Sequence, residues 1–330
     1  MSMCPPKAKR PRSDIAPRLR RILLVFLDGV GIAEGDPATN PLARAELPNL
    51  RALCGGVLPI AEDLPGGLLA SRTATLSGID ANLGIPGLPQ SGTGQTALLT
   101  GTNSARLLGR HFGPWVPTGL RDLLREESLF QQARRRDLSV AVANAYPRAH
   151  IDLEGGTRKR PGAFPYAAAA ARVLDRDEGS LRRGDALVSS ITTEGWRRQV
   201  DPDAPIVTPA EAGARLAGLA SQSDLTVFAH YDTDLVGHRG GMAGAVTALE
   251  RVDRFFGGLL DKLADDTLLL VSSDHGNVED VRVGHTRNPA LFAAAGPAHD
   301  EAGHRIRSVT DVTPTILYLL ESRPERPAGK

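Results

Sequence analysis

Residues 225–277 read LTVFAHYDTDLVGHRGGMAGAVTALERVDRFFGGLLDKLADDTLLLVSSDHGN, and the pattern of apolar residues in them indicates the class of fold. The apolar runs Leu225–Ala229 and Thr267–Ser272 each predict a buried strand. Between them, over Gly241–Lys262, apolar side chains recur at helical spacing, which predicts an amphipathic crossover helix. A strand, a crossover helix and a second strand form a right-handed βαβ unit, so we expect a parallel sheet.

Further apolar runs extend this pattern toward both ends of the chain. Ile22–Leu27, Leu138–Ala143 and Ala186–Ser189 predict three more strands. The segment Asp311–Leu320 starts with an acid and has a proline near its first turn, which predicts a packing helix. Strands alternating with helices indicate an α/β fold with a mainly parallel sheet.

The charge is balanced overall but unevenly distributed. The 330 residues include 39 Lys and Arg and 38 Asp and Glu, for a net charge of +1, which favours neither nucleic acid nor a membrane as partner. Residues 1–20 are rich in Lys, Arg and Pro without interleaved aromatic residues, and we expect a disordered solvated tail. Residues 103–223 carry 18 basic and 14 acidic side chains and interrupt an otherwise acidic chain.

Cysteine content and hydropathy indicate the compartment. Cys4 and Cys54 are the two cysteines, too few for a disulfide framework, so we expect a cytoplasmic protein. The apolar run Ile22–Leu27 follows basic residues but is too short for a signal peptide. No stretch approaches the about 20 apolar residues of a membrane helix.

Two stretches in the first third of the chain carry candidate site residues. Asp28 stands at the carboxyl end of the first predicted strand and precedes glycines that permit a tight turn. In PQSGTGQTALLTG, residues 89–101, Ser91 and Thr93 precede an apolar helical segment. A hydroxyl at a helix N-terminus can act as a nucleophile toward phosphate or merely cap the helix.

A third stretch, HYDTDLVGHRG, follows the predicted strand Leu225–Ala229. Asp234 and His238 are four residues apart, so in a helix they lie on one face with Cβ atoms about 5–6 Å apart. The pair could share one cation, and His230 and Asp232 could compete for that role.

The fourth stretch, VSSDHGNVED, ends the predicted strand Thr267–Ser272. Asp274 and His275 are adjacent there, and His285 follows ten residues later. Adjacent side chains on an extended segment point in opposite directions, so both reach one ion only if the chain bends, as Gly276 permits.

All four stretches fall at predicted strand ends, where open α/β sheets bind ligands. Three histidines and three acids exceed the needs of a single zinc and suit a two-metal centre: His238, His275, His285, Asp28, Asp234 and Asp274. Mixed imidazole and carboxylate ligands favour zinc or manganese over magnesium.

The motifs DG-x-G, S-x-x-G, D-x-x-x-H, S-x-DHGN-x-E and HT-x-NP, in this order, resemble the alkaline phosphatase superfamily. They are most similar to the metal-binding core of cofactor-independent phosphoglycerate mutase and phosphopentomutase. The resemblance implies a three-layer α/β core with a mainly parallel sheet, formed by residues 21–102 and 224–330. It also implies a smaller inserted α/β cap, residues 103–223, that binds substrate.

The resemblance further implies roles for particular residues. One divalent ion, Mn²⁺ or Zn²⁺, would be held by Asp28, Ser91, Asp274 and His275, and a second by Asp234, His238 and His285. Ser91 would be the nucleophile that becomes phosphorylated, with Thr93 as the alternative. Residues that orient these ligands would be Asn277, Glu279, Thr286 and Asn288.

Two departures from the mutases limit the expected function. Gln95 stands where the mutases usually have a histidine, and their substrate-binding arginine motifs are not found in residues 103–223. Arg106, Arg110, His111 and Arg148 are the candidate substrate contacts. We expect a metal-dependent phosphatase or phosphomutase acting on a small phosphorylated metabolite. The alternatives are a phosphodiesterase or pyrophosphatase of the same superfamily, and a metal-binding regulatory protein without turnover.

Overall fold

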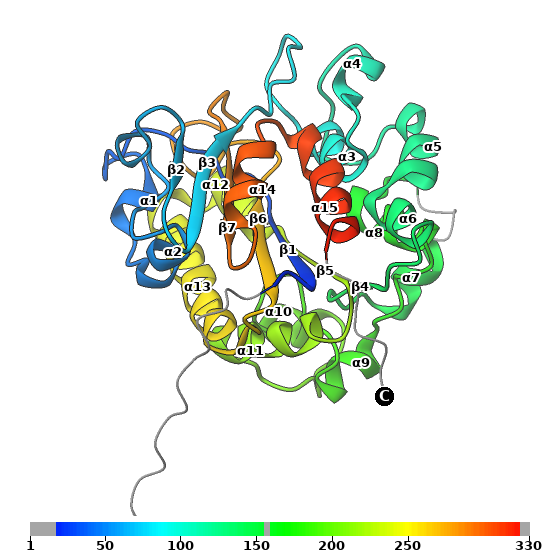
Figure 1. The fold of residues 1–330 in the computed structure, drawn as a ribbon. Helices are drawn as coiled ribbons and strands as arrows, with labels where there is room; N and C mark the ends of the chain where they lie inside the picture. The colour runs from blue at the N-terminus through cyan, green and yellow to red at the C-terminus, as the bar shows by residue number, and fades with distance from the viewer. Residues whose placement is uncertain (1–17, 155–158, 324–330) are drawn as a thin grey trace, which may run out of the picture.

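The fold is built on one seven-stranded sheet, seen in a computed structural model that describes residues 18–154 and 159–323 (Figure 1). Most of the predicted basic tail, residues 1–17, lies outside the described residues. The strands are β1 (Arg21–Leu27), β2 (Leu68–Ala70), β3 (Ala74–Ile79), β4 (Val140–Val142), β5 (Leu225–His230), β6 (Thr267–Ser272) and β7 (Ala290–Ala295). Their order across the sheet is β2-β3-β7-β6-β1-β5-β4.

The sheet is mainly parallel, as predicted. Strand β1 lies between β6 and β5 and pairs in parallel with both, and β4 pairs in parallel with β5. Strand β7 is antiparallel to both β6 and β3, so only β7 and β2 oppose the other five strands. The register pairs Leu27 with His230 and Phe26 with Ser272, which brings the carboxyl ends of β1, β5 and β6 together.

Sequence patterns located some strands and missed others. The predicted strand Ala186–Ser189 was wrong: this segment makes one isolated bridge, between Asn144 and Leu187, before the chain turns at Ile191 with φ 69°. Strands β2, β3 and β7 were missed. The sequence of β7, ALFAAA, is dominated by alanine, which favours helices over strands.

Helices cover both faces of the sheet and complete the predicted three layers. Along β1, Leu24 and Phe26 point into one core while Leu23 and Val25 point into the other. The first core is covered by α3 (Ser91–Thr100), α5 (Thr118–Glu127), α6 (Leu129–Arg134), α8 (Ala163–Ala170), α14 (His299–Arg305) and α15 (Val312–Glu321). The second is covered by α1 (Pro41–Arg44), α2 (Pro48–Leu53), α11 (Pro209–Ala220) and α13 (Gly241–Lys262).

The remaining helices are short. They are α4 (Ser104–Leu108), α7 (Arg148–Glu154), α9 (Glu178–Arg183), α10 (Glu194–Gln199) and α12 (Asp232–Arg239), with 3-10 turns at Ala61–Asp63 and Val309–Asp311. The predicted crossover helix corresponds to α13 and the predicted C-terminal packing helix to α15.

Helices α11 and α13 approach each other closely through two glycines. A Cβ on Gly213 would lie 2.0 Å from the carbonyl oxygen of Phe255, and one on Gly258 would lie 1.9 Å from that of Ala210. No side chain fits at such distances, so glycine at both positions sets the spacing of the two helices.

The segment 103–223 is continuous with the central sheet. It supplies β4, and Leu129, Phe130 and Ala133 from α6 are buried in the first core. Its last helix, α11, packs on the opposite face against α13. The strand of this segment thus extends the sheet, and its helices pack on both faces. Its role as a substrate-binding cap stays a prediction.

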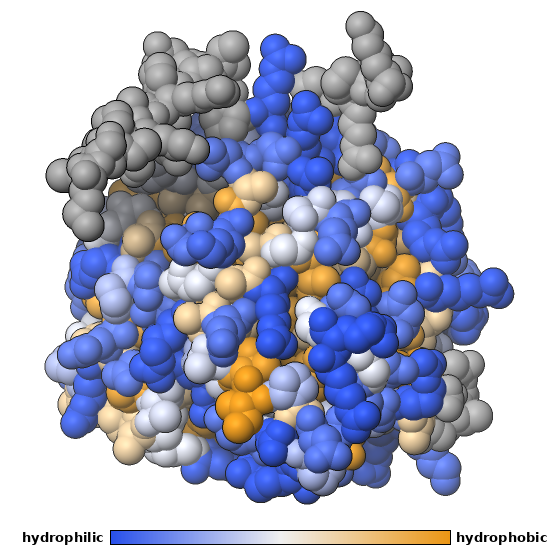
Figure 2. All heavy atoms as spheres, turned by 90° about the horizontal axis from the view of Figure 1, so that it is seen from below, coloured by the Kyte–Doolittle hydropathy of each residue, from blue (hydrophilic) through white to orange (hydrophobic). Residues whose placement is uncertain are grey.

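The face at the bottom of the molecule in Figure 1 is mostly hydrophilic. Figure 2 shows polar side chains over most of this face, with apolar ones in small separate groups. None of the helices in the described part of the chain combines the length and apolar character needed to cross a bilayer.

Candidate metal centre and active site

The site forms where the carboxyl ends of the three central strands meet. Asp28 follows β1, Asp274 lies two residues after β6, and Asp234 lies in the first turn of α12, just after β5. The turn after Asp28 needs glycine, because Gly29 has φ 64° and a Cβ there would lie 2.6 Å from Oδ1 of Asp234. The βα turns thus bring three carboxylates from distant parts of the sequence together.

Helix α3 delivers the candidate nucleophile. Ser91 is its first residue, and all ten residues of the helix are buried. A Cβ on Gly92 would lie 2.2 Å from the carbonyl oxygen of Trp115, and one on Gly94 would lie 2.9 Å from that of Asp274. The small residues therefore let the N-terminus of α3 press against the Asp274 loop, where helix dipole and free N–H groups favour an anion.

The two candidate hydroxyls are in different surroundings. Ser91 Oγ lies 3.0 Å from Nε2 of His275 and borders an open cavity. Thr93 Oγ1 instead donates to the carbonyl of Gln90 over 3.1 Å and accepts from the backbone N–H of Phe112 over 3.2 Å. Ser91 is thus the hydroxyl that faces the cluster of candidate ligands.

A first group of candidate ligands surrounds His275. Its Nε2 lies 3.5 Å from Oδ1 of Asp28, 3.6 Å from Oδ2 of Asp274 and 3.0 Å from Ser91 Oγ. His275 and Asp274 are fully buried, and Asp28 is nearly so. Asp28, Asp274 and His275 offer donor atoms within 4.8 Å of one another, close enough to share one ion.

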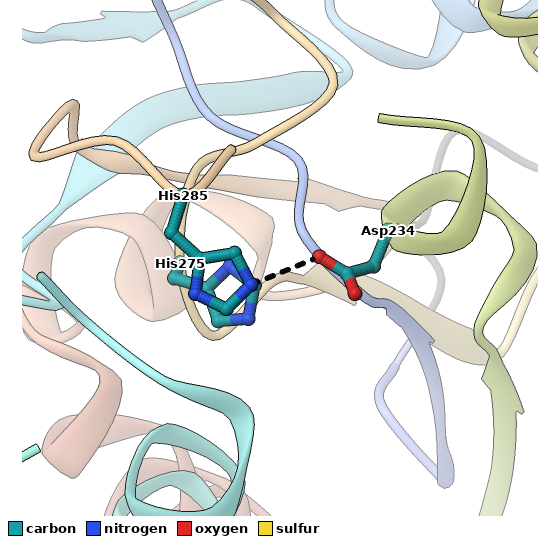
Figure 3. A group of neighbouring side chains, drawn as sticks. All are labelled: Asp234, His275 and His285. Atoms are coloured by element: carbon teal, nitrogen blue, oxygen red, sulfur yellow. Dashed lines mark ion pairs between the residues drawn. The ribbon is translucent and has the colours of Figure 1, made fainter. Parts of the chain in front are cut away.

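A second group lies beside the first. Asp234 Oδ2 is 3.4 Å from Nε2 of His238, and Oδ1 is 3.4 Å from Nε2 of His285. The two imidazoles are themselves 3.0 Å apart, Nε2 to Nε2. Figure 3 shows the rings of His275 and His285 stacked, with the Asp234 carboxylate facing them, and their centroids are 3.9 Å apart. The stacked rings therefore join the two groups.

The first group has carboxylate oxygens without partners. Asp28 Oδ1 and both oxygens of Asp274 are buried and accept no hydrogen bond. Burial, followed by the nearby charges of Asp274 and Asp234, raises the pKa of Asp28 well above its ordinary value. Burial and the charge of Asp234 likewise raise the pKa of Asp274. Buried anionic oxygens left unpaired are costly, and a divalent cation would satisfy them, so these residues fit a metal site.

In the second group, the pKa of the carboxylate is lowered, whereas it is raised in the first. Burial alone would raise the pKa of Asp234, but the hydrogen bond from His285, the charge of His275 and the hydrogen bond from Asn277 lower it to about 2. Burial opposes protonation of His285, yet its bond to Asp234 raises the pKa of that imidazole. Asp234 is therefore anionic near neutral pH, as a metal ligand must be.

The four residues expected to orient ligands are all close to the site. Asn277 Nδ2 donates to Asp234 Oδ1 over 2.6 Å. Glu279 is buried, and its Oε2 accepts from the backbone N–H groups of Gly31 at 2.9 Å and Asn277 at 2.7 Å. Its Oε1 accepts from Thr286 Oγ1 at 2.5 Å and Asn288 Nδ2 at 3.0 Å. One carboxylate thus connects three of the motif loops.

The competing residues of the third motif have other partners. His230 is buried and its ring Nδ1 lies 2.6 Å from the carbonyl oxygen of Ser189, while Asp232 pairs with Arg251 at 3.3 Å. Two contacts were missed from sequence: Gln95 Nε2 donates to Asp28 Oδ2 over 3.1 Å, and Thr233 Oγ1 donates to the Asp28 carbonyl over 2.6 Å. The contact of Gln95 could have been suspected from the sequence, because Gln95 stands where the mutases usually have a histidine.

An open cavity of about 730 Å³ leads to these ligands. Its walls are formed by Asp28, Leu88, Gln90, Ser91, Pro114, Tyr231, Asp232, Asp234, Leu235, His238, Arg239 and His285. The candidate nucleophile and four of the candidate ligands therefore face one space that a small molecule could enter.

The predicted substrate contacts are not among the residues that line this cavity. Arg148 donates from Nη2 to Asp177 at 2.5 Å, and His111 Nε2 lies 3.1 Å from the carbonyl oxygen of Asn82. Arg110 lies over the ring of Phe112, and Arg106 Nη2 lies near Gly84. The cavity is lined instead by Arg239, which sequence reasoning missed although it directly follows His238.

The carboxyl-terminal part of the core is similar to a known group of metalloenzymes. Residues 206–324 match the family model of the Metalloenzyme superfamily. The resemblance drawn from the sequence motifs is thereby confirmed, and divalent metal binding is the property that this superfamily implies.

Curated relatives carry a more particular name. The chain is 30% identical to the 2,3-bisphosphoglycerate-independent phosphoglycerate mutase of Chloroflexus aggregans over 210 residues, which are 60% of this chain and 35% of that protein. It is 34% identical to the enzyme of the same name from Halobacterium salinarum over 200 residues, 58% of this chain and 38% of that protein. The matched region spans little more than a third of the length of these relatives.

Solved structures share the fold. The PH0037 protein from Pyrococcus horikoshii matches 95% of this chain and all of its own with a TM-score of 0.53 and 13% identity. A cold-active alkaline phosphatase from a psychrophilic Shewanella matches 91% of this chain and 99% of its own with a TM-score of 0.50 and 15% identity. These similarities confirm the three-layer α/β architecture.

Proposed function

We propose that this chain is a metal-dependent phosphoryl-transfer enzyme that acts on a small phosphorylated metabolite through a phosphoserine at Ser91. The observation that carries the proposal is the position of Ser91. It begins α3, faces the cavity, and places its Oγ 3.0 Å from Nε2 of His275, beside carboxylate oxygens of Asp28 and Asp274 that accept no hydrogen bond. The names of the curated relatives support phosphoryl transfer as the reaction.

Seven residues would hold two divalent ions, Mn²⁺ or Zn²⁺: Asp28, Ser91, Asp274 and His275 for one, and Asp234, His238 and His285 for the other. When bound, two such ions lower the pKa of a coordinated hydroxyl, hold phosphoryl oxygens and neutralise developing charge. Asn277 and Glu279 keep the ligands in position through the hydrogen bonds described above.

The chain itself supplies the nucleophile and its orientation. The Ser91 hydroxyl gives up its proton, Oγ attacks phosphorus in line and a Ser91–phosphate bond forms. The bond from phosphorus to the substrate oxygen breaks, and that oxygen takes up a proton from solvent. A second acceptor then takes the phosphoryl group from Ser91. We favour water as that acceptor, because Leu88 and Leu235 at the cavity are 44% and 52% exposed and leave the site accessible to solvent. Transfer back to another hydroxyl of the substrate would make the enzyme a mutase.

A cytoplasmic location stays a prediction.

The test is phosphoenzyme formation with a matched pair of hydroxyl variants. The Mn²⁺- or Zn²⁺-loaded protein is incubated with a panel of phosphomonoesters, and the intact chain and its peptides are analysed by mass spectrometry. We expect phosphate on Ser91 in the wild-type protein and in Thr93→Val, and none in Ser91→Ala. Turnover by Ser91→Ala with loss in Thr93→Val would contradict the assignment of the nucleophile.

A further inference from the structure

Apolar as well as polar residues line the cavity that leads to the candidate ligands. Four of the residues that line it are apolar or aromatic: Leu88, Pro114, Tyr231 and Leu235. Leu88 and Leu235 are two of the seven large hydrophobic residues exposed in the described part of the chain. Apolar surface exposed at a cavity mouth is typical of a site that buries it against a ligand.

The wall of the cavity carries few basic side chains in the part of the chain that the structure describes. Among the described residues that line the cavity, Arg239 is the single Lys or Arg, and it makes no ion pair with a described residue. Three further arginines, Arg198, Arg251 and Arg254, line a second cavity, and Arg251 is paired there with Asp232. Asp232 lines both cavities, so this ion pair stands between them.

Counting charges indicates how many anionic groups the site can hold. Two divalent ions would bring four positive charges, and the carboxylates of Asp28, Asp234 and Asp274 would offset three of them. Arg239 adds one, which leaves two positive charges, the number needed for one phosphoryl dianion. A second phosphate or a carboxylate on the substrate would find no further Lys or Arg on the wall of this cavity, where the remaining side chains include Leu88, Pro114 and Leu235.

Helix α12 sets this arrangement. Asp234 and His238 lie one turn apart on one face, and Leu235 and Arg239 lie one turn apart on the adjoining face, four residues being about one turn. The helix therefore presents metal ligands and, beside them, an apolar side chain and a guanidinium to the same cavity.

From these observations we propose that the site selects phosphomonoesters whose esterified group is uncharged and largely apolar, such as an aryl group. Arg239 binds the phosphoryl group, and Leu88, Pro114 and Leu235 contact the leaving group. This inference rests on the proposed function and narrows it, because it disfavours substrates that carry a carboxylate or a second phosphate.

Binding of two phosphonates to the Mn²⁺-loaded wild-type protein, measured by calorimetry, tests the proposal. Phenylphosphonate and phosphonoacetate share one phosphonate group and differ in an apolar or an anionic arm, and neither has an ester bond to cleave. Burying the ring against Leu88 and Leu235 should make phenylphosphonate bind about tenfold more tightly. Equal affinity, or a preference for phosphonoacetate, would overturn the proposal.

Three variants assign the contacts. Leu235→Ser should weaken phenylphosphonate about fivefold and leave phosphonoacetate unchanged. Leu107→Ser, at an exposed leucine of α4 outside the cavity, is the matched control and should change neither. Arg239→Gln should weaken both phosphonates by the same factor. A selective loss of phosphonoacetate in Arg239→Gln would instead place this guanidinium on the ligand's arm and contradict the proposal.

The outcomes also separate this inference from the proposed function. If the metal-loaded protein binds neither phosphonate and turns over no phosphomonoester, the proposed function fails and takes this inference with it. If monoesters are turned over through Ser91 but phosphoglycerate is used with a kcat/KM equal to that of phenyl phosphate, the proposed function stands and the substrate class is wrong.

Discussion

The carboxylate of Glu279 accepts a hydrogen bond from the backbone N–H of Gly31 over 2.9 Å, although 248 residues separate the two in the chain. The contact requires glycine, because a Cβ on Gly31 would lie 2.4 Å from Oε1 of Glu279. A Cβ on Gly276 would lie 2.2 Å from the same oxygen. Glu279 therefore fixes the loop after β1 against the loop after β6, and with them the positions of Asp28 and Asp274.

Replacing Glu279 by Gln should weaken metal binding. Both carboxylate oxygens accept from two donors each, and an amide NH₂ in place of one oxygen would face two donors. We expect metal affinity to fall about 10- to 100-fold, measured by titration of the metal-free protein with Mn²⁺. Glu62→Gln removes an exposed carboxylate that also accepts from a loop N–H, that of Gly35, and should leave metal affinity unchanged. Unchanged affinity in Glu279→Gln would show that the loops hold without it.

The metal-free protein should gain stability from Asp274→Asn. Asp274 is buried with a raised pKa, so the folded state binds more protons than the unfolded state and stability falls as pH rises through the folded pKa. At neutral pH the neutral Asn should raise the free energy of unfolding by about 1–3 kcal/mol in chelator, and this gain should shrink as pH falls toward the ordinary Asp value.

Urea unfolding with and without metal checks this prediction. Saturating Mn²⁺ should stabilise the wild-type protein more than Asp274→Asn, which reverses the order of the two proteins. Asp265→Asn, at an exposed aspartate, is the matched control and should change the free energy of unfolding by less than about 0.5 kcal/mol. A metal-free Asp274→Asn protein less stable than wild type at neutral pH would contradict the prediction.

Gln95→Leu should shift metal binding to higher pH. The Gln95 amide donates to Asp28 Oδ2, and this bond lowers a pKa that burial and neighbouring carboxylates raise. Removing the donor raises the pKa of Asp28 further, and metal binding requires the deprotonated carboxylate. We expect the midpoint of Mn²⁺ affinity against pH to move upward. Gln131→Leu, on α6 and remote from the centre, is the control, and an equal shift in both variants would refute the role of Gln95.

Two glycines of α11 should respond oppositely to alanine. Gly213→Ala places a Cβ 2.0 Å from the carbonyl oxygen of Phe255 and should destabilise the protein by about 1–3 kcal/mol or more. Gly218 is exposed on the same helix with no atom within 4 Å of its Cβ position. Gly218→Ala should therefore stabilise the protein by up to about 1 kcal/mol through helix propensity, and thermal unfolding distinguishes the two. Similar effects at both positions would show that α11 and α13 separate readily.

Periodicity in the sequence was sufficient where an element is long or strongly apolar. The run Ile22–Leu27 and the helical spacing over Gly241–Lys262 correctly predicted β1 and α13, because burial on both faces of the sheet or along one face of a helix dictates those patterns. Periodicity missed the strands Leu68–Ala70, Ala74–Ile79 and Ala290–Ala295, and it was wrong for Ala186–Ser189. Short segments owe their conformation to the strands beside them, which the local sequence does not encode.

By itself, the sequence determined which residues could form the site. The four motif stretches named every member of both candidate ligand groups, because residue type and position after a strand limit the chemistry. Tertiary structure alone decided which hydroxyl faces the cavity, since Thr93 Oγ1 is turned to Gln90 and Phe112 while Ser91 Oγ is left beside His275. It likewise placed Arg239 and Leu235, rather than Arg148, on the cavity wall, because direction in space depends on how helices pack and not on spacing along the chain.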